Sequence, residues 1–206
     1  MGIFRKAKHS LKPKGFTVVE LLIVIAVIGI LVGIVAVMYP GYQKRARDAE
    51  RRSDMSQLAA ALGAYAIQKN NYMAAGSGCG LFGDGNGWIS LEPPDGGGWY
   101  PKAVTTCLKD AGVISNASDF IDPLGCKSDS GGVCGTWQSV PAQGYMKATC
   151  LKGGAPITYF MTHLENEPLN NPVIDTLCDV GSLPWFDANG QKWGTNYGMN
   201  YYVIAK

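Results

Sequence analysis

The feature that most constrains this chain is a long apolar run that follows a single carboxylate. Residues 21–39 carry no charged side chain, and Glu20 stands directly before them. As a helix this run is about 28 Å long, close to the thickness of the hydrocarbon core of a bilayer. A lone acid in such a helix costs roughly 2.5 to 3.5 kcal/mol on insertion scales, so it indicates a functional residue with a partner. The sequence therefore predicts a transmembrane helix over residues 16–39 with a functional glutamate near its start.

A short basic segment precedes the apolar run. Residues 1–15 contain five Lys or Arg side chains and no acid, and the segment ends at Gly15, directly before Phe16. An ordinary secretory signal also has a basic start, but a small-residue cleavage site follows its apolar run, and the residues after Met38 lack that pattern. A generic membrane anchor explains the hydrophobicity but neither Glu20 nor the Gly15–Phe16 junction.

The order of a basic leader, a glycine, Phe-Thr-Val-Val-Glu and an aliphatic run resembles the class III signal peptide of the type IV pilin family, over residues 14–31. In that family a prepilin peptidase cuts after the glycine and methylates the new N-terminal residue. The resemblance implies cleavage between Gly15 and Phe16 and N-methylation of Phe16. It also implies that Glu20 faces the N-terminal amine of a neighbouring subunit. A buried charge pair of this kind fixes register more than it adds net stability.

A charged segment follows the apolar run. Residues 45–54 read Arg-Ala-Arg-Asp-Ala-Glu-Arg-Arg-Ser-Asp, which resembles a pattern found in many pilins and pseudopilins. The spacing of Lys44, Asp48 and Arg52 predicts ion pairs along a solvated helix face, which in a filament would also meet adjacent subunits. Pro40 and the glycine after it predict an interruption and a kink between the apolar and the charged helical segments.

An apolar stripe then recurs at helical spacing. It is formed by Met55, Leu58, Leu62 and Tyr65, with Ala49, Ala59 and Ala66 as small apolar positions. This pattern predicts an amphipathic helix over residues 40–69 that packs on a globular domain.

The cysteines indicate where that domain lies. All six follow the apolar run, and an even number in a glycine-rich domain indicates an oxidising compartment, outside the cytoplasmic membrane. The basic residues on the two sides of the run are equally balanced and do not decide the orientation. We expect sequence neighbours to pair, although six cysteines allow 15 pairings. The expected bonds are Cys79–Cys107, Cys126–Cys134 and Cys150–Cys178.

Residues 70–206 are expected to form an irregular domain rich in β structure. Alternation predicts strands over residues 145–151, 157–164 and 197–205, and a short helix is predicted from Pro101 to just before Gly112. With the family resemblance, the expected fold is α+β, a long N-terminal helix packed on a small, disulfide-containing antiparallel sheet. The expected divisions are a leader (1–15), a transmembrane helix (16–39), an amphipathic helix (40–69) and a globular domain (70–206).

Candidate chemical sites in that domain are few. Asp187 and Asn189 resemble the start of a calcium loop, and some pseudopilins hold calcium in a C-terminal loop, but the rest of the loop is missing. A hairpin turn is favoured there, and no cofactor is expected. His163 has no triad spacing. The aromatic side chains are expected to lie in the core rather than in a sugar-binding patch. They are Trp88, Trp99, Tyr100, Trp137, Trp185 and Trp193.

These observations favour assembly over catalysis. The expected function is a structural subunit of a type IV pilus or related filament, with a prepilin peptidase, related subunits, an assembly platform and the membrane as partners. The alternatives are a type II secretion pseudopilin and a minor pilin that serves adhesion or DNA uptake. A membrane-anchored hydrolase lacks a nucleophile–base pair.

The net charge and the expected location of the chain follow from the same features. Loss of the leader takes the net charge from +2 to −3, and the mildly acidic globular part argues against general nucleic-acid binding. We expect a single-pass precursor in the cytoplasmic membrane, with its C-terminal domain outside, and then a cell-surface filament.

Overall fold

The structure is a computed structural model that describes residues 15–74, 76–91, 98–125, 144–169, 171–182 and 192–205. The chain divides into two compact units, Met1–Gln43 and Lys44–Lys206. Helix α1 (Val18–Lys69) contributes its first half to the N-terminal unit and its second half to the globular unit.

Helix α1 is continuous through the predicted interruption. Pro40 and Gly41 both lie inside it, so the expected break between two helices is wrong. Proline costs about 3 kcal/mol in a helix interior. The long helix-forming segments on both sides of Pro40 offset this cost.

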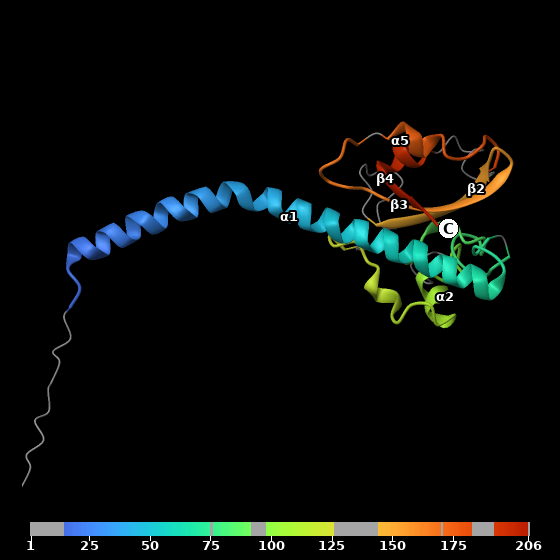
Figure 1. The fold of residues 1–206 in the computed structure, drawn as a ribbon, viewed down its shortest axis with the longest axis horizontal. Helices are drawn as coiled ribbons and strands as arrows, with labels where there is room; N and C mark the ends of the chain where they lie inside the picture. Colours follow the sequence, from blue (N-terminus) through green and yellow to red (C-terminus); the bar gives the residue numbers. More distant parts are fainter. Residues whose placement is uncertain are drawn as a thin grey trace, which may run out of the picture. The chain divides into compact units, whose positions relative to one another are not determined.

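Four antiparallel strands form one sheet in the described part of the globular unit, in the order β1-β2-β3-β4 (Figure 1). The strands are β1 (Gly87–Trp88), β2 (Tyr145–Lys152), β3 (Ala155–Thr162) and β4 (Tyr201–Ile204). A tight turn at Gly153 and Gly154, both at positive φ, joins β2 to β3. The carboxylate of Asp179 accepts a hydrogen bond from each of these two backbone N–H groups, which fixes the turn.

Two of the predicted strands agree with β2 and β3 to within two residues, and the third differs. Trp193–Tyr197 form helix α5, and Gly198 ends this helix in the left-handed conformation at φ 69°. Glycine is the usual residue at such a helix end. The predicted third strand therefore began too early, and β4 starts only at Tyr201. Strand β1, with two residues, is too short to produce an alternating pattern.

The sheet separates two apolar cores. One core packs against α3 (Pro172–Asp175) and α5, and the other packs against the second half of α1 and against α2 (Val104–Asp110) (Figure 1). Strand residues Met146, Ala148, Tyr159 and Met161 belong to the first core, and Tyr145 and Phe160 belong to the second. Alternate side chains of β2 and β3 therefore point to opposite faces of the sheet.

The apolar stripe of α1 packs on the globular domain as predicted. Met55, Leu58, Leu62 and Tyr65 are all buried in the second core. Ala49 is exposed, so its assignment to the stripe is wrong.

Helix α2 begins at Val104, three positions after the predicted start at Pro101. The segment before Val104 is not helical, because the carbonyl groups of Trp99 and Lys102 accept hydrogen bonds from backbone N–H groups of the loop over residues 77–87 instead of from a following helical turn. Gly112, at φ 72°, lies beyond the end of α2 as predicted.

Two disulfides tie the irregular segments to this framework. Cys79–Cys107 joins the glycine-rich loop to α2, and Cys150–Cys178 joins β2 to the segment after α3. These pairs are the ones predicted for these four cysteines. Cys126 and Cys134 lie outside the described residues.

Candidate functional site

Helix α1 begins with a capping box at the predicted functional glutamate. The backbone N–H and the hydroxyl of Thr17 donate to Oε2 of Glu20 over 2.7 and 2.8 Å, and the backbone N–H of Glu20 donates to Oγ1 of Thr17 over 3.2 Å. These bonds satisfy backbone N–H groups that have no partner within the first turn of a helix. The carboxylate of Glu20 also lies at the positive end of the helix dipole. The family resemblance implies only a neighbouring amine as the partner of Glu20, but a threonine followed three residues later by a glutamate is a capping signal that identifies Thr17 as a second partner.

The predicted cleavage junction lies just before this cap. Gly15, Phe16 and Thr17 adopt no regular secondary structure, and the side chain of Phe16 is 87% exposed. The Gly15–Phe16 bond therefore lies in an accessible segment outside the helix.

The first half of α1 exposes apolar side chains on every face. Between Val18 and Tyr42 the exposed fraction of the large apolar side chains ranges from 49% at Val24 to 83% at Val37. The helix is long and apolar enough to cross a membrane. A helix that is apolar all round and unburied requires lipid or other protein around it.

The second half of α1 enters a buried network of ions centred on Arg51. Its guanidinium is 1% exposed and donates to both oxygens of Asp122 over 2.8 and 2.9 Å. A third nitrogen donates to Asp48 over 3.1 Å and to Glu165 over 3.0 Å. Burial alone lowers the pKa of Arg51, but the hydrogen bonds and charges of Asp122 and Glu165 outweigh it and hold the pKa above its ordinary value. Arg51 is therefore a permanent buried cation.

Asp48 and Arg47 attach the same stretch of helix to the segment after β3. Asp48 accepts from the backbone N–H groups of Glu165 and Asn166 over 2.8 and 3.0 Å. Burial raises the pKa of Asp48, and these hydrogen bonds lower it further than burial raises it. Arg47 makes a two-pronged pair with Glu165 over 2.6 and 2.7 Å, which lowers the pKa of Glu165. The network therefore fixes α1 to the globular domain with both rotation and register defined.

Asp54 extends this polar layer by one helical turn. It is 7% exposed, and its Oδ2 accepts from the hydroxyl of Tyr145 over 2.6 Å. Burial raises the pKa of Asp54, and the charges of Glu50 and Asp122 add to the rise against the opposing effect of the Tyr145 bond. Within the part of the chain that the structure describes, the other carboxylate oxygen of Asp54 has no hydrogen-bond partner.

The predicted solvated face is therefore wrong for three of its charged residues, Asp48, Arg51 and Asp54, which are buried. The predicted pairs at a spacing of four are replaced by the Asp48–Arg51 pair at a spacing of three and by partners far along the chain. The pilin-like pattern over residues 45–54 serves here as an anchor between helix and domain.

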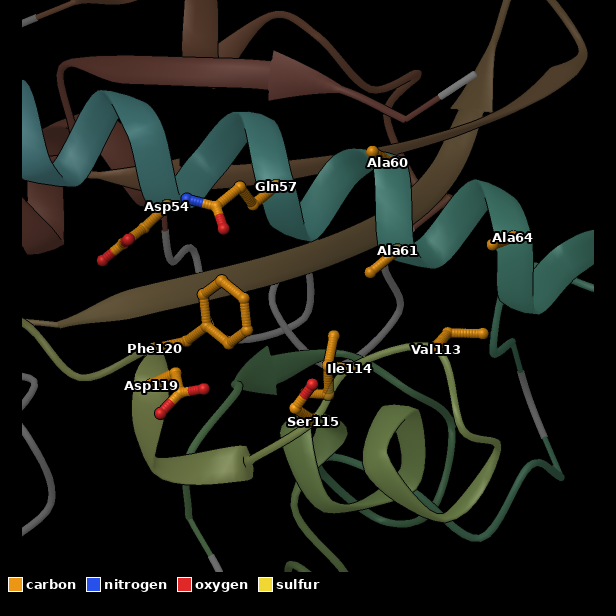
Figure 2. A pocket seen from close by; sticks show the side chains of 10 residues that line it. All are labelled: Asp54, Gln57, Ala60, Ala61, Ala64, Val113, Ile114, Ser115, Asp119 and Phe120. Atoms are coloured by element: carbon orange, nitrogen blue, oxygen red, sulfur yellow. The ribbon is translucent and has the colours of Figure 1, made fainter.

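A groove runs beside the exposed flank of α1 (Figure 2). Its volume is about 560 Å³. Small side chains of α1 form one wall, and the segment after α2 forms the other, with Phe120 and Ile114 facing the helix. The lining residues are Asp54, Gln57, Ala60, Ala61, Ala64, Val113, Ile114, Ser115, Asp119 and Phe120. The two acids lie at the same end of the groove in Figure 2.

Comparison with known protein families gives one match, the prokaryotic N-terminal methylation motif, over residues 11–36. With the long apolar helix, this motif supports a type IV pilin-like or pseudopilin protein. The motif covers a small part of the chain and includes Gly15, Phe16 and Glu20. No curated protein and no solved structure matches the chain.

The pilin-like motif has two consequences for the site. It implies processing by a prepilin peptidase and assembly with pilin-like subunits, and with the apolar helix it fits a membrane-anchored precursor. The exposed first half of α1 is thus the candidate membrane-spanning segment. The ion network of Arg51 holds the second half of α1 on the globular domain.

The remaining predicted site residues are dispersed. The calcium candidates Asp187 and Asn189 lie outside the described residues, as do Trp137 and Trp185. Trp88, Tyr100 and Trp193 are buried in the core as expected, whereas Trp99 is 56% exposed and stacks on Phe82 with ring centroids 5.7 Å apart. His163 is buried at the end of β3, with Nδ1 2.9 Å from the carbonyl oxygen of Gly198, and burial lowers its pKa.

Proposed function

We propose that the chain is a structural subunit of a type IV pilus or a closely related cell-surface filament. Its role is assembly, with no enzymatic activity and no cofactor. The observation that carries the proposal is the first half of α1, an unburied apolar helix that begins directly after the methylation motif. Lipid covers this helix before assembly, and the helices of other copies cover it afterwards.

The energetics of the apolar helix support a direct transfer from membrane to filament. A buried aliphatic side chain is favoured over an exposed one by roughly 1.5 to 3 kcal/mol. About 20 such side chains exclude a stable free monomer in water, so the subunit exchanges lipid contacts for protein contacts without entering solvent.

Processing prepares the subunit in this proposal. The prepilin peptidase removes residues 1–15 and methylates the amine of Phe16, and Glu20 then pairs with the amine of a neighbouring copy. The exposed junction at Gly15 and Phe16 supports access for the peptidase. The disulfides at Cys79–Cys107 and Cys150–Cys178 support a position of the domain in an oxidising compartment outside the membrane.

The test is mass spectrometry of the N-terminal peptide, combined with analysis of filaments sheared from cells. We expect N-methylphenylalanine from Phe16 as the first residue and this chain as the dominant protein of the sheared fraction. An intact Met1 start, or a cut beyond Tyr39, would overturn the processing step. A correctly processed chain that never appears in sheared filaments would favour a pseudopilin, and one present in trace amounts would favour a minor pilin.

A further inference from the structure

The groove beside α1 carries unneutralised negative charge at one end. Asp54 and Asp119 line this end (Figure 2), and Glu50 lies four positions before Asp54 on the same face of the helix. In the described ranges none of these three carboxylates pairs with a cationic side chain. The nine-tenths burial of Asp54, with one carboxylate oxygen unpaired, makes this end of the groove a favourable place for an incoming cation.

The rest of the groove fits an extended side chain with an apolar stem. Ala60, Ala61 and Ala64 have short side chains, so another chain can approach the backbone of α1 closely there. Ile114 and Phe120 supply the opposite, apolar wall (Figure 2). A lysine or arginine buries its methylene groups along such a wall while its charged end reaches an acid.

The same chain carries a matching cation on the other side of the helix. Arg45 is exposed, and no acid among the described residues pairs with it. Arg45 and Asp54 are separated by about two and a half turns of α1, which places them on opposite sides of the helix axis. Arg45 therefore cannot enter the groove of its own molecule, and both surfaces of one molecule are available at the same time.

We propose that the groove is the docking surface for a second copy of this chain, and that Arg45 of one copy enters the acidic end of the groove of the next. This inference rests on the proposed function as a filament subunit. The two contacting surfaces differ, so the contact is heterologous. A heterologous contact that does not close on itself propagates into an open helical filament.

Charge reversal tests the contact in cells that carry the assembly machinery, with the yield of sheared filaments as the readout. Arg45→Glu and Asp119→Lys should each lower the yield by about tenfold or more, because like charges then face each other at every contact. The double variant Arg45→Glu/Asp119→Lys should restore the yield. Lys69→Glu is the matched control, since it makes the same charge change at an exposed position in the last turn of α1, outside the groove, and its yield should match wild type.

A cysteine cross-link tests the geometry independently. Arg45→Cys combined with Asp119→Cys should give a ladder of dimers, trimers and larger species under mild oxidation, with neither single variant doing so. Dimers alone would show a closed contact and would overturn the heterologous arrangement. If the double-cysteine variant forms filaments normally but gives no cross-linked species, the docking itself is overturned.

The outcomes also separate this inference from the proposed function. If wild type forms filaments and both single charge reversals give the same yield as wild type, the inference alone is overturned. The same holds if the double variant gives no higher yield than the single variants. A wild-type chain that forms no filament would overturn the proposed function and this inference with it.

Discussion

Replacement of Arg51 by methionine should lower the free energy of unfolding by about 3 to 5 kcal/mol. Arg51 makes charged hydrogen bonds of 2.8 to 3.1 Å to Asp48, Asp122 and Glu165. Methionine replaces much of the apolar stem but leaves Asp48 and Asp122, each 1% exposed at the side chain, without their cation. Removal of one partner from a buried ion pair typically costs this much, because the remaining charge stays buried. The loss is large against a total stability of about 5 to 15 kcal/mol.

The measurement is thermal unfolding of the full-length chain in detergent, followed by tryptophan fluorescence. The expected loss corresponds to a decrease in Tm of about 6 to 20 °C for a chain of this size. Lys102→Met is the comparison variant, since it removes the exposed Lys102–Asp110 pair, and it should cost less than about 1 kcal/mol. An Arg51→Met protein as stable as the Lys102→Met protein would refute the reasoning.

Acid should reduce the difference between Arg51→Met and wild type. The pKa values of Asp48 and Glu165 are lowered in the folded protein, so their stabilisation is complete above the unfolded pKa values, about 3.9 for Asp and 4.3 for Glu, and is lost as the pH falls through the folded values. The variant lacks the cation that favours the ionised acids, so protonation costs it less. The gap in Tm should narrow below about pH 4. A gap that stays constant from neutral to acidic pH would contradict this account.

Three further outcomes are expected. Glu20→Ala should insert into the membrane normally and be missing from sheared filaments; its normal incorporation as the sole subunit would remove the charge-pair argument. Burial lowers the pKa of Lys147 to about 7, so above that pH the native chain has released a proton that the unfolded chain keeps to about pH 10.4. The free energy of unfolding of wild type should therefore rise relative to that of Lys147→Met by about 1.4 kcal/mol per pH unit between pH 7.5 and 9. Urea unfolding of both proteins at each pH measures this, and a difference that does not change with pH would contradict it. Replacement of the Cys150–Cys178 bond by two serines should cost roughly 3 to 4 kcal/mol for a separation of 28 residues, and non-reducing peptide mapping that found those two cysteines joined elsewhere would contradict the fold.

The elements that the sequence predicts well are those with a local period. The stripe that includes Met55 and Leu62 repeats every three to four residues because α1 buries one side there. Strands β2 and β3 send alternate side chains to the two cores, and the apolar run is recognised by its length and its lack of charge. The start of the last predicted strand fails for a local reason as well. Trp193 to Tyr197 form one short helical turn, and Gly198 then reverses the backbone, which alternation alone does not reveal.

The ion network was not predictable because its pairs join distant parts of the chain. Arg47 and Glu165 are separated by 118 positions, and Arg51 and Asp122 by 71. A run of alternating charges looks the same whether it faces water or buried acids, and the prior favours water. The sequence shows that cations and anions are present, while the fold decides which of them meet.

The cap between Thr17 and Glu20 also has a consequence for the proposed removal of the leader. The proposed scissile bond, Gly15–Phe16, lies upstream of the first helical residue, so the peptidase can bind extended backbone without unwinding a turn. Both side chains that hold the helix start remain on the product. The proposed cleavage therefore leaves a product whose first helical turn is already capped and needs no rearrangement before the helix packs against other copies.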